Sequence, residues 1–153
     1  MTLSPTALLT IILLGISPLA SAQMSEDLTY CDMPLETPVG CNTKASEVTC
    51  DDYAVQWLYM NTLMLKSMPE QFISQMEDEF KKFSKQPIQA SSFGYPLDGQ
   101  KITYKHKGHW KYKIVAYGVV NAQPVMLNIS LLNDPVNNDA LPDFVQVMIQ
   151  LKD

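Results

Sequence analysis

The chain contains no arginine, and all eleven of its basic residues are lysines. Lysine acts as a point charge, whereas the planar arginine side chain can bind a phosphate group through two parallel hydrogen bonds. The absence of arginine therefore argues against a dedicated nucleic-acid or nucleotide site, and we expect no nucleic-acid partner. Lysine alone can still attract polyanions through its charge.

The sequence also lacks the short motifs that accompany common catalytic chemistries. It has no Gly-x-Ser-x-Gly, His-Glu-x-x-His, Cys-x-x-Cys or phosphate-loop pattern. Its two histidines, His106 and His109, would need a third ligand to hold zinc, and no residue nearby in the sequence supplies one. We therefore expect no metal, no cofactor and no catalytic residues, and we favour a non-enzymatic role.

The apolar run near the N-terminus, residues 8–14, is too short to span a bilayer comfortably. It precedes Ala20, Ser21 and Ala22, which form a small-residue cleavage site of the kind that ends a secretory signal peptide. We interpret residues 1–22 as a signal peptide, with an uncleaved anchor or a core helix as alternatives. The mature protein is expected to be periplasmic or secreted, with no stable membrane insertion after cleavage.

Cysteine is scarce, and Cys31, Cys41 and Cys50 all lie in the N-terminal part of the mature chain. An oxidising compartment favours disulfides, and three cysteines allow three alternative single bridges that each leave one thiol over. We favour a bridge between Cys31 and Cys50, because it would tie the N-terminal arm to the start of the first helix. The chain-entropy estimate gives such a loop a stabilisation of about 3 kcal/mol.

The composition fits one compact domain, with 46% hydrophobic and 18% charged residues in a chain of 153. The net charge of −5 is unevenly spread. Residues 23–100 carry twelve acids and five lysines, whereas residues 101–153 carry four acids and six lysines. The C-terminal third is therefore the basic part of an acidic protein.

Residues 23–48 are polar and show no sustained periodicity, which predicts an extended, disulfide-tethered arm before a single domain of residues 49–153. Thr49 and Asp52 have the spacing of a capping box and predict a helix from about residue 51 to residue 67. Pro69 should interrupt this helix and start a second one that reaches about Lys85. The second helix carries an apolar stripe, made of Phe72, Met76, Phe80 and Phe83.

The remainder of the chain has the period of two that is typical of strands with one buried face. Apolar residues alternate over residues 101–107, 109–120 and 125–132, which are separated by turns at Gly108 and at residues 121–124. Residues 144–151 alternate in the same way and predict a fourth strand. A helix that precedes such a meander is expected to pack across one face of the sheet.

The predicted fold class is therefore α+β, with an N-terminal helix pair packed on a four-stranded antiparallel sheet. In element order this resembles cystatin-like and NTF2-like domains. The resemblance implies a helix lying across a curved sheet and transfers no site residue. A cystatin-type Gln-x-Val-x-Gly loop is absent, since Gln123 and Val125 lead straight into a strand.

Five lysines fall within thirteen residues that contain no acid: Lys101, Lys105, Lys107, Lys111 and Lys113. We take these lysines, with His109 and Tyr112, as a candidate surface that binds an acidic protein, an anionic envelope polymer or a lipid head group. A local positive field speeds encounter with such partners. The alternative is a solvated sheet face whose lysines discourage edge-to-edge aggregation.

These features favour an exported, non-catalytic binding protein for a macromolecular partner, of the inhibitor, immunity or envelope accessory type. One alternative is a small-ligand carrier or enzyme with a pocket between helix and sheet, lined by Trp57, Met64, Phe72, Trp110 and Tyr112. Another is a structural secretion or envelope subunit, which a covalent dimer through the spare thiol would favour. An open cavity between helix and sheet favours the carrier, whereas a filled core argues against it.

Overall fold

The computed structural model describes residues 27–153, so the predicted signal peptide lies outside the described residues. The first five strands are β1 (Thr29–Tyr30), β2 (Met33–Pro34), β3 (Asn42–Lys44), β4 (Glu47–Thr49) and β5 (Tyr53–Tyr59). Helix α1 (Thr62–Glu79) precedes the four long strands β6 (Phe83–Ser92), β7 (Tyr95–His106), β8 (His109–Val120) and β9 (Gln123–Leu131). The chain ends in the 3₁₀ turn η1 (Asn138–Ala140), helix α2 (Asp143–Met148) and strand β10 (Gln150–Leu151).

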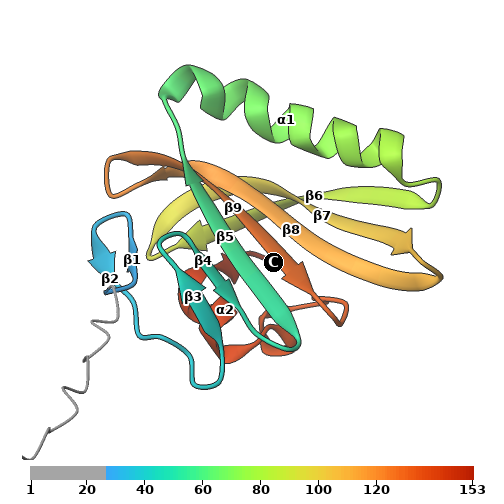
Figure 1. Ribbon diagram of the computed structural model, residues 1–153. Helices are drawn as coiled ribbons and strands as arrows, with labels where there is room; N and C mark the ends of the chain where they lie inside the picture. The colour runs from blue at the N-terminus through green and yellow to red at the C-terminus, as the bar shows by residue number, and fades with distance from the viewer. Residues whose placement is uncertain (1–26) are drawn as a thin grey trace, which may run out of the picture.

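Eight strands form one antiparallel sheet in the order β10–β6–β7–β8–β9–β5–β4–β3, and β1 pairs with β2 in a separate hairpin. Figure 1 shows α1 above this curved sheet and α2 below it. The protein is therefore mostly β, and the predicted helix pair on a four-stranded sheet is wrong. Residues 27–153 contain one long helix, and twice the expected number of strands pair in the sheet.

The first predicted helix, residues 51–67, is helical only over residues 62–67, which begin α1. Its earlier part is strand β5, which pairs with β9 over seven residues and with β4 on its other side. Val55 and Trp57 are buried on one face of this strand, while Gln56 and Leu58 on the other face are exposed. β-Branched and aromatic residues fit such a half-buried, pleated surface well. Pairing on both edges therefore outweighs the helical spacing of the apolar residues in this segment.

Helix α1 is capped by Asn61, whose side-chain carbonyl oxygen accepts a hydrogen bond from the Met64 backbone N–H at 2.9 Å. Asparagine at this position satisfies one of the free N–H groups of the first turn. The predicted break at Pro69 does not occur, and the helix ends at Glu79 rather than at Lys85. Pro69 removes one helical hydrogen bond but is itself buried, as are Ile73 and Met76 on the same helix.

Tight turns connect β1 to β2 and join the long strands. Both central residues of each turn have positive φ, in the pairs Cys31–Asp32, Phe93–Gly94, Lys107–Gly108 and Asn121–Ala122. Two-residue turns of this kind match the twist of the flanking strands and fix their register. The turns predicted at Gly108 and at residues 121–124 are thus present, and they join the expected antiparallel strands.

Apolar side chains fill two cores, one on each face of the sheet. Under α1, Ile73 and Met76 pack against Ile102, Val115 and Met126. The larger core lies on the other face, where the N-terminal hairpin and α2 cover the strands with Leu28, Tyr30, Phe144, Val145 and Met148. Each face of the sheet therefore carries a packed layer, although α1 covers only part of its face.

The predicted last strand, residues 144–151, is mostly helical. Its buried residues Phe144, Val145, Met148 and Ile149 are spaced as on one face of a helix. Only Gln150 and Leu151 pair as a strand, with β6. The alternation in this segment fitted a strand, but burial of the helical face against the larger core determines the structure.

The disulfide joins Cys41 to Cys50, with a Cα–Cα distance of 4.5 Å, so the predicted bridge between Cys31 and Cys50 is wrong. The β3–β4 hairpin places Cys41 and Cys50 side by side, directly outside the pair Asn42–Thr49. Cys31 is a buried free thiol. Burial also raises its pKa to about 11, which disfavours the reactive thiolate and a covalent dimer through this residue.

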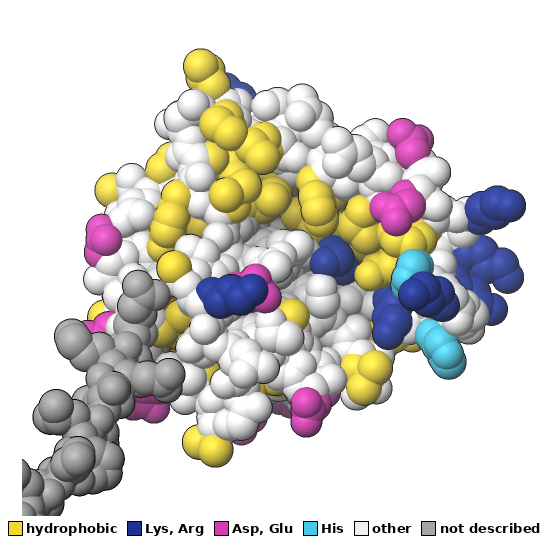
Figure 2. Space-filling model, in the orientation of Figure 1, with side chains coloured by type: hydrophobic (Ala, Val, Ile, Leu, Met, Phe, Trp, Pro, Cys, Tyr) yellow, Lys and Arg dark blue, Asp and Glu magenta, His cyan; other side chains and the backbone are white. Residues whose placement is uncertain are grey.

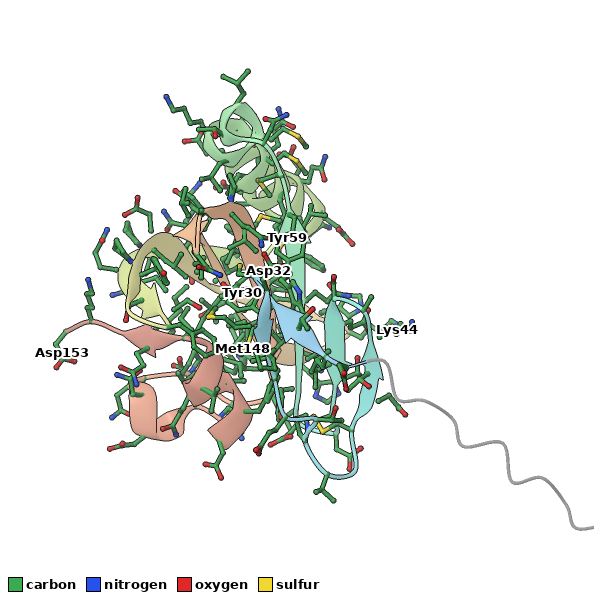
Figure 3. The ribbon with its side chains drawn as sticks, turned by 90° about the vertical axis from the view of Figure 1, so that its left-hand side faces the viewer. Tyr30, Asp32, Lys44, Tyr59, Met148 and Asp153 are labelled. Atoms are coloured by element: carbon green, nitrogen blue, oxygen red, sulfur yellow. A yellow bond between two sulfur atoms is a disulfide. The ribbon has the colours of Figure 1, made fainter. Side chains whose placement is uncertain are left out.

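The β1–β2 turn is anchored to the sheet by polar contacts. The Cys31 backbone N–H donates to the Tyr59 hydroxyl oxygen at 2.8 Å, and the Asn121 side-chain amide donates to the Cys31 carbonyl at 2.8 Å. Figure 3 shows Tyr30, Asp32 and Tyr59 close together where the hairpin meets β5. The predicted arm is therefore part of the packed structure from residue 28 onward, where Leu28 is already buried.

Candidate functional site

The five predicted lysines do not share one surface. Strand alternation places Lys111 and Lys113 on the α1 side of the sheet, because Val115 on the same strand packs under α1. Lys101 lies on the other side, where its ammonium forms an ion pair with Asp134. Tyr112 packs against the larger core, so it does not belong to an exposed binding surface either.

Three of these lysines do gather at one end of the molecule, the tip of the β7–β8 hairpin. The Lys105 backbone N–H donates to the Lys82 carbonyl at 3.0 Å, which brings the α1–β6 connection to this tip. Figure 2 shows lysine and histidine side chains clustered there. We call this surface the basic tip, defined by Lys81, Lys82, Lys105, Lys107 and Lys111.

Aromatic side chains accompany the basic tip. Trp110 remains 49% exposed, with the Lys105 ammonium 5.9 Å from the centre of its ring. His109 is exposed beside it, and His106 packs edge-on against Phe80. Among residues 27–153, no three His, Cys, Asp or Glu side chains are placed to hold a metal ion. The tip can thus offer positive charge and one exposed indole ring.

A groove of about 570 Å³ lies between α1 and the strands β4, β5 and β9. Its apolar lining includes Leu58, Met68, Phe72 and Met126, and its polar lining consists of Lys44, Ser46, Glu47, Gln56, Gln71, Gln75 and Asn128. Figure 2 shows hydrophobic side chains gathered along α1 above a mostly polar area of the sheet. The volume lies within the range of small-molecule sites.

The groove exists because α1 covers only part of its face of the sheet. Ile73 and Met76 hold the helix over β7, β8 and β9, so β5 and β4 extend beyond its edge. The flank of the helix that overhangs these strands carries Met68, Gln71, Phe72 and Gln75, which share one side at the spacing of the helical turn. Among residues 27–153, no packed element fills the angle between this flank and β5.

The groove coincides only in part with the pocket expected from the sequence. Phe72 lines it as predicted, and Trp57 belongs to its wall, although the Trp57 ring packs edge-on against Tyr30 in the larger core. Met64, Trp110 and Tyr112 do not line it. The amide side chains that dominate its polar lining were missed, because isolated glutamines and asparagines show no spacing pattern until β5, β9 and α1 are placed together.

A chain of hydrogen bonds crosses the sheet beside this groove. The Lys113 ammonium donates to the Asn128 side-chain oxygen and to the Ser130 hydroxyl, both at 2.7 Å. The Asn128 amide donates to the Gln56 side-chain oxygen at 3.3 Å, and the Gln56 amide donates to Glu47 at 3.1 Å. Register explains the alignment, because Asn128, Gln56 and Glu47 lie directly opposite one another on β9, β5 and β4.

Lys113, at the inner end of this chain, is the only charged residue buried within residues 27–153, with 9% of its surface exposed. Its ammonium lies 6.0 Å from the Phe72 ring centre and forms no ion pair with a carboxylate of the described residues. Burial lowers the pKa of Lys113 to about 8. The prediction of a solvent-exposed Lys113 is therefore wrong, since α1 covers this part of the strand.

Glu47, at the outer end, has the opposite environment. Its two carboxylate oxygens accept hydrogen bonds from Gln56 and from the Thr49 hydroxyl, the latter at 2.9 Å. These hydrogen bonds hold the pKa of Glu47 below its usual value, and the nearby charge of Lys44 acts in the same direction. This hydrogen-bond chain thus runs from the buried Lys113 ammonium to the Glu47 carboxylate at the groove rim. The two charges fix the orientation of the Asn128 and Gln56 side-chain amides.

Sequence comparison gives no relative from which a function could be transferred. No protein-family model matches the chain, and no curated protein matches its sequence. Within residues 27–153, neither helix has the length and apolar character needed to cross a membrane. The groove and the basic tip are therefore the features from which a function is inferred.

Proposed function

We propose that this protein is an exported binding protein that holds a small amphipathic molecule in the groove between α1 and the sheet. The observation that carries this proposal is the groove itself, about 570 Å³ with an apolar side on α1 and an amide-rich side on the strands. Small-molecule sites combine mostly apolar walls with a few placed polar groups. A helix packed flush over β4 and β5 would have left no such space.

Export is supported by two independent features. The apolar segment of residues 8–14 precedes small residues at 20–22, as in a signal peptide. The bridge between Cys41 and Cys50 is of a kind that persists in oxidising compartments such as the periplasm or the extracellular space. A binding protein in such a compartment would meet its ligand outside the cytoplasm.

The proposal is tested with N-phenyl-1-naphthylamine, a neutral probe whose fluorescence rises in apolar surroundings. The purified exported protein should bind this probe saturably. Replacing Gln71 by tryptophan places a large ring in the groove without removing a core contact, because Gln71 is exposed. We expect Gln71→Trp to weaken probe binding about tenfold or more.

Lys66→Trp is the matched control for this experiment. Lys66 is an exposed residue of the same helix and does not line the groove. This variant should bind the probe as the wild type does. Absence of saturable binding to the wild type, or equal binding by both tryptophan variants, would refute a ligand site in the groove.

A second candidate function is recognition of an acidic macromolecule through the basic tip. The specific observation is that Lys81 and Lys82 join the hairpin lysines beside an exposed Trp110. Positive charge around an aromatic anchor suits a partner with a negatively charged surface. This function is compatible with ligand binding, because the groove is lined by other residues.

Charge reversal tests the second candidate. Glutamate at Lys105, Lys107 and Lys111 should abolish salt-sensitive capture of envelope components by the immobilised protein. Glutamate at Lys44, Lys66 and Lys152 gives the same net charge on other surfaces and should leave capture intact. If both triple variants lost capture equally, net charge alone would explain capture, and recognition through the basic tip would be refuted.

A further inference from the structure

Lys113 is placed as a recognition group for the groove, an inference that rests on ligand binding at this site. Its ammonium is held by Asn128 and Ser130, and Asn128 itself lines the groove. Phe72 likewise links the Lys113 ammonium to the groove, because its ring lies over the ammonium and also forms part of the groove wall. Lys113 does not itself line the groove, but its ammonium lies directly behind Asn128 and Phe72, which do.

This positive charge is incompletely satisfied by the protein. An ammonium group has three N–H donors, and two of them bond to the neutral oxygens of Asn128 and Ser130. Charged groups are rarely buried without a partner of opposite charge, because removal from water disfavours them strongly. Lys113 forms no ion pair with any described carboxylate, so an anion supplied by a ligand would complete its environment.

The rest of the groove restricts the shape of such an anion. Phe72, Met68 and Leu58 provide apolar contacts, and the flexible methionine side chain adapts well to an apolar chain. At the outer rim the charges of Glu47 and Lys44 offset each other, and Glu47 is already bonded to Gln56 and Thr49. The ligand would thus carry one negative group at its inner end and an apolar body toward Leu58.

We propose that the groove binds a monocarboxylate with an apolar body, with the carboxylate beside Asn128, where it is nearest to the Lys113 ammonium, and the apolar part along Phe72 and Met68. A carboxylate suits this end better than a phosphate ester, because a single ammonium with neutral amides offers one positive charge and no bidentate guanidinium. The two oxygens of a carboxylate can accept from the ammonium and from an adjacent amide.

The test compares dodecanoate with dodecan-1-ol as competitors of bound N-phenyl-1-naphthylamine. The two share a chain length and differ in the charge of the head group. With the wild-type protein near neutral pH, dodecanoate should displace the probe at a concentration about tenfold lower than the alcohol. In Lys113→Met the neutral probe should still bind, while the preference for the acid over the alcohol disappears.

Lys101→Met is the matched control, because Lys101 lies on the opposite face and pairs with Asp134; it should keep the preference. Equal displacement by acid and alcohol in the wild type would overturn the carboxylate assignment, and this comparison needs no variant. Survival of the preference in both Lys113→Met and Lys113→Gln would also overturn it. Failure of the probe to bind at all would instead refute the groove as a ligand site.

Discussion

The buried ammonium of Lys113 should make a contribution to stability that becomes more favourable as the pH rises above about 8. Burial lowers the pKa of Lys113 from 10.5 to about 8 in the folded protein, whereas the unfolded chain keeps the ordinary lysine value. As the pH rises from about 8 to 10.5, the folded protein releases a proton that the unfolded chain still binds. The contribution of Lys113 to the free energy of unfolding must therefore increase across this window, because at this residue the unfolded state binds more protons.

The size of the effect follows from the pKa difference. Each pKa unit corresponds to about 1.4 kcal/mol, so the charged lysine lowers the free energy of unfolding by about 3 kcal/mol below pH 8. Lys113→Met removes this penalty but leaves the oxygens of Asn128 and Ser130 without their donor, at about 1 kcal/mol each. We therefore expect Lys113→Met to be more stable than the wild type near neutral pH by about 1 kcal/mol.

The measurement is urea unfolding at a series of pH values, followed through the fluorescence of buried Trp57. Burial raises the pKa values of Cys31 and Tyr30, so these groups lower the stability at alkaline pH in both proteins. Their contribution cancels when the variant is compared with the wild type. The wild type should overtake Lys113→Met between about pH 8 and pH 10. A difference that stays constant over this range would refute the burial of a charged lysine under α1.

Three substitutions test the local structure. Ala122→Gly should raise the free energy of unfolding by about 0.5–1 kcal/mol, because Ala122 has a φ of 63° that disfavours any residue with a Cβ atom; unchanged thermal unfolding would contradict this turn geometry. Asn61→Ala should lower the free energy of unfolding by about 1 kcal/mol through loss of the α1 cap, and Asn61→Asp should restore it in the same thermal assay. Gly99→Ala should lower the free energy of unfolding by about 1–3 kcal/mol, because the new Cβ would lie 2.5 Å from the Val115 carbonyl oxygen; wild-type stability in urea would show that β7 and β8 are less closely paired.

The hairpins of the C-terminal half could be predicted because their signals are local. Gly108 and Asn121 favour the left-handed conformation that two-residue turns require, and the flanking segments alternate in hydrophobicity. Turn and strand signals therefore agree over residues 101–132, where the structure has antiparallel strands. No distant part of the chain is needed to interpret this segment.

The N-terminal half could not be predicted in this way, because its conformation depends on distant partners. Strand β5 is stabilised by β9, and α2 by the larger core. Neither contact can be recognised from the residues of the segment itself. Asn61 is a favourable helix cap, but the helix predicted over residues 51–67 placed it inside a helix and not at the start of one. The bridge between Cys41 and Cys50 had a usable signal, since both are equally distant from the turn at Ala45–Ser46.

The candidate site shows the same division. The clustering of Lys105, Lys107 and Lys111 was visible in the sequence, because these residues lie on one hairpin. Burial of Lys113 was not visible, since its strand alternates regularly and only the placement of α1 decides which face is covered. The groove brings together α1, β4, β5 and β9, and its polar residues become neighbours only through the register of the sheet.

The strand order of the sheet has a consequence for how the chain assembles. Strands β6 to β9 meet their neighbours through turns of two residues, and short loops close at little entropic cost. Strand β5 cannot pair with the sheet along this edge until β9 has been added, since Tyr53 pairs with Leu131. In pulse-labelling hydrogen exchange we expect amides of β7 and β8 to be protected before those of β5, and the reverse order would contradict this sequence of events. During synthesis, the strand that forms one wall of the groove is thus made early and docks late.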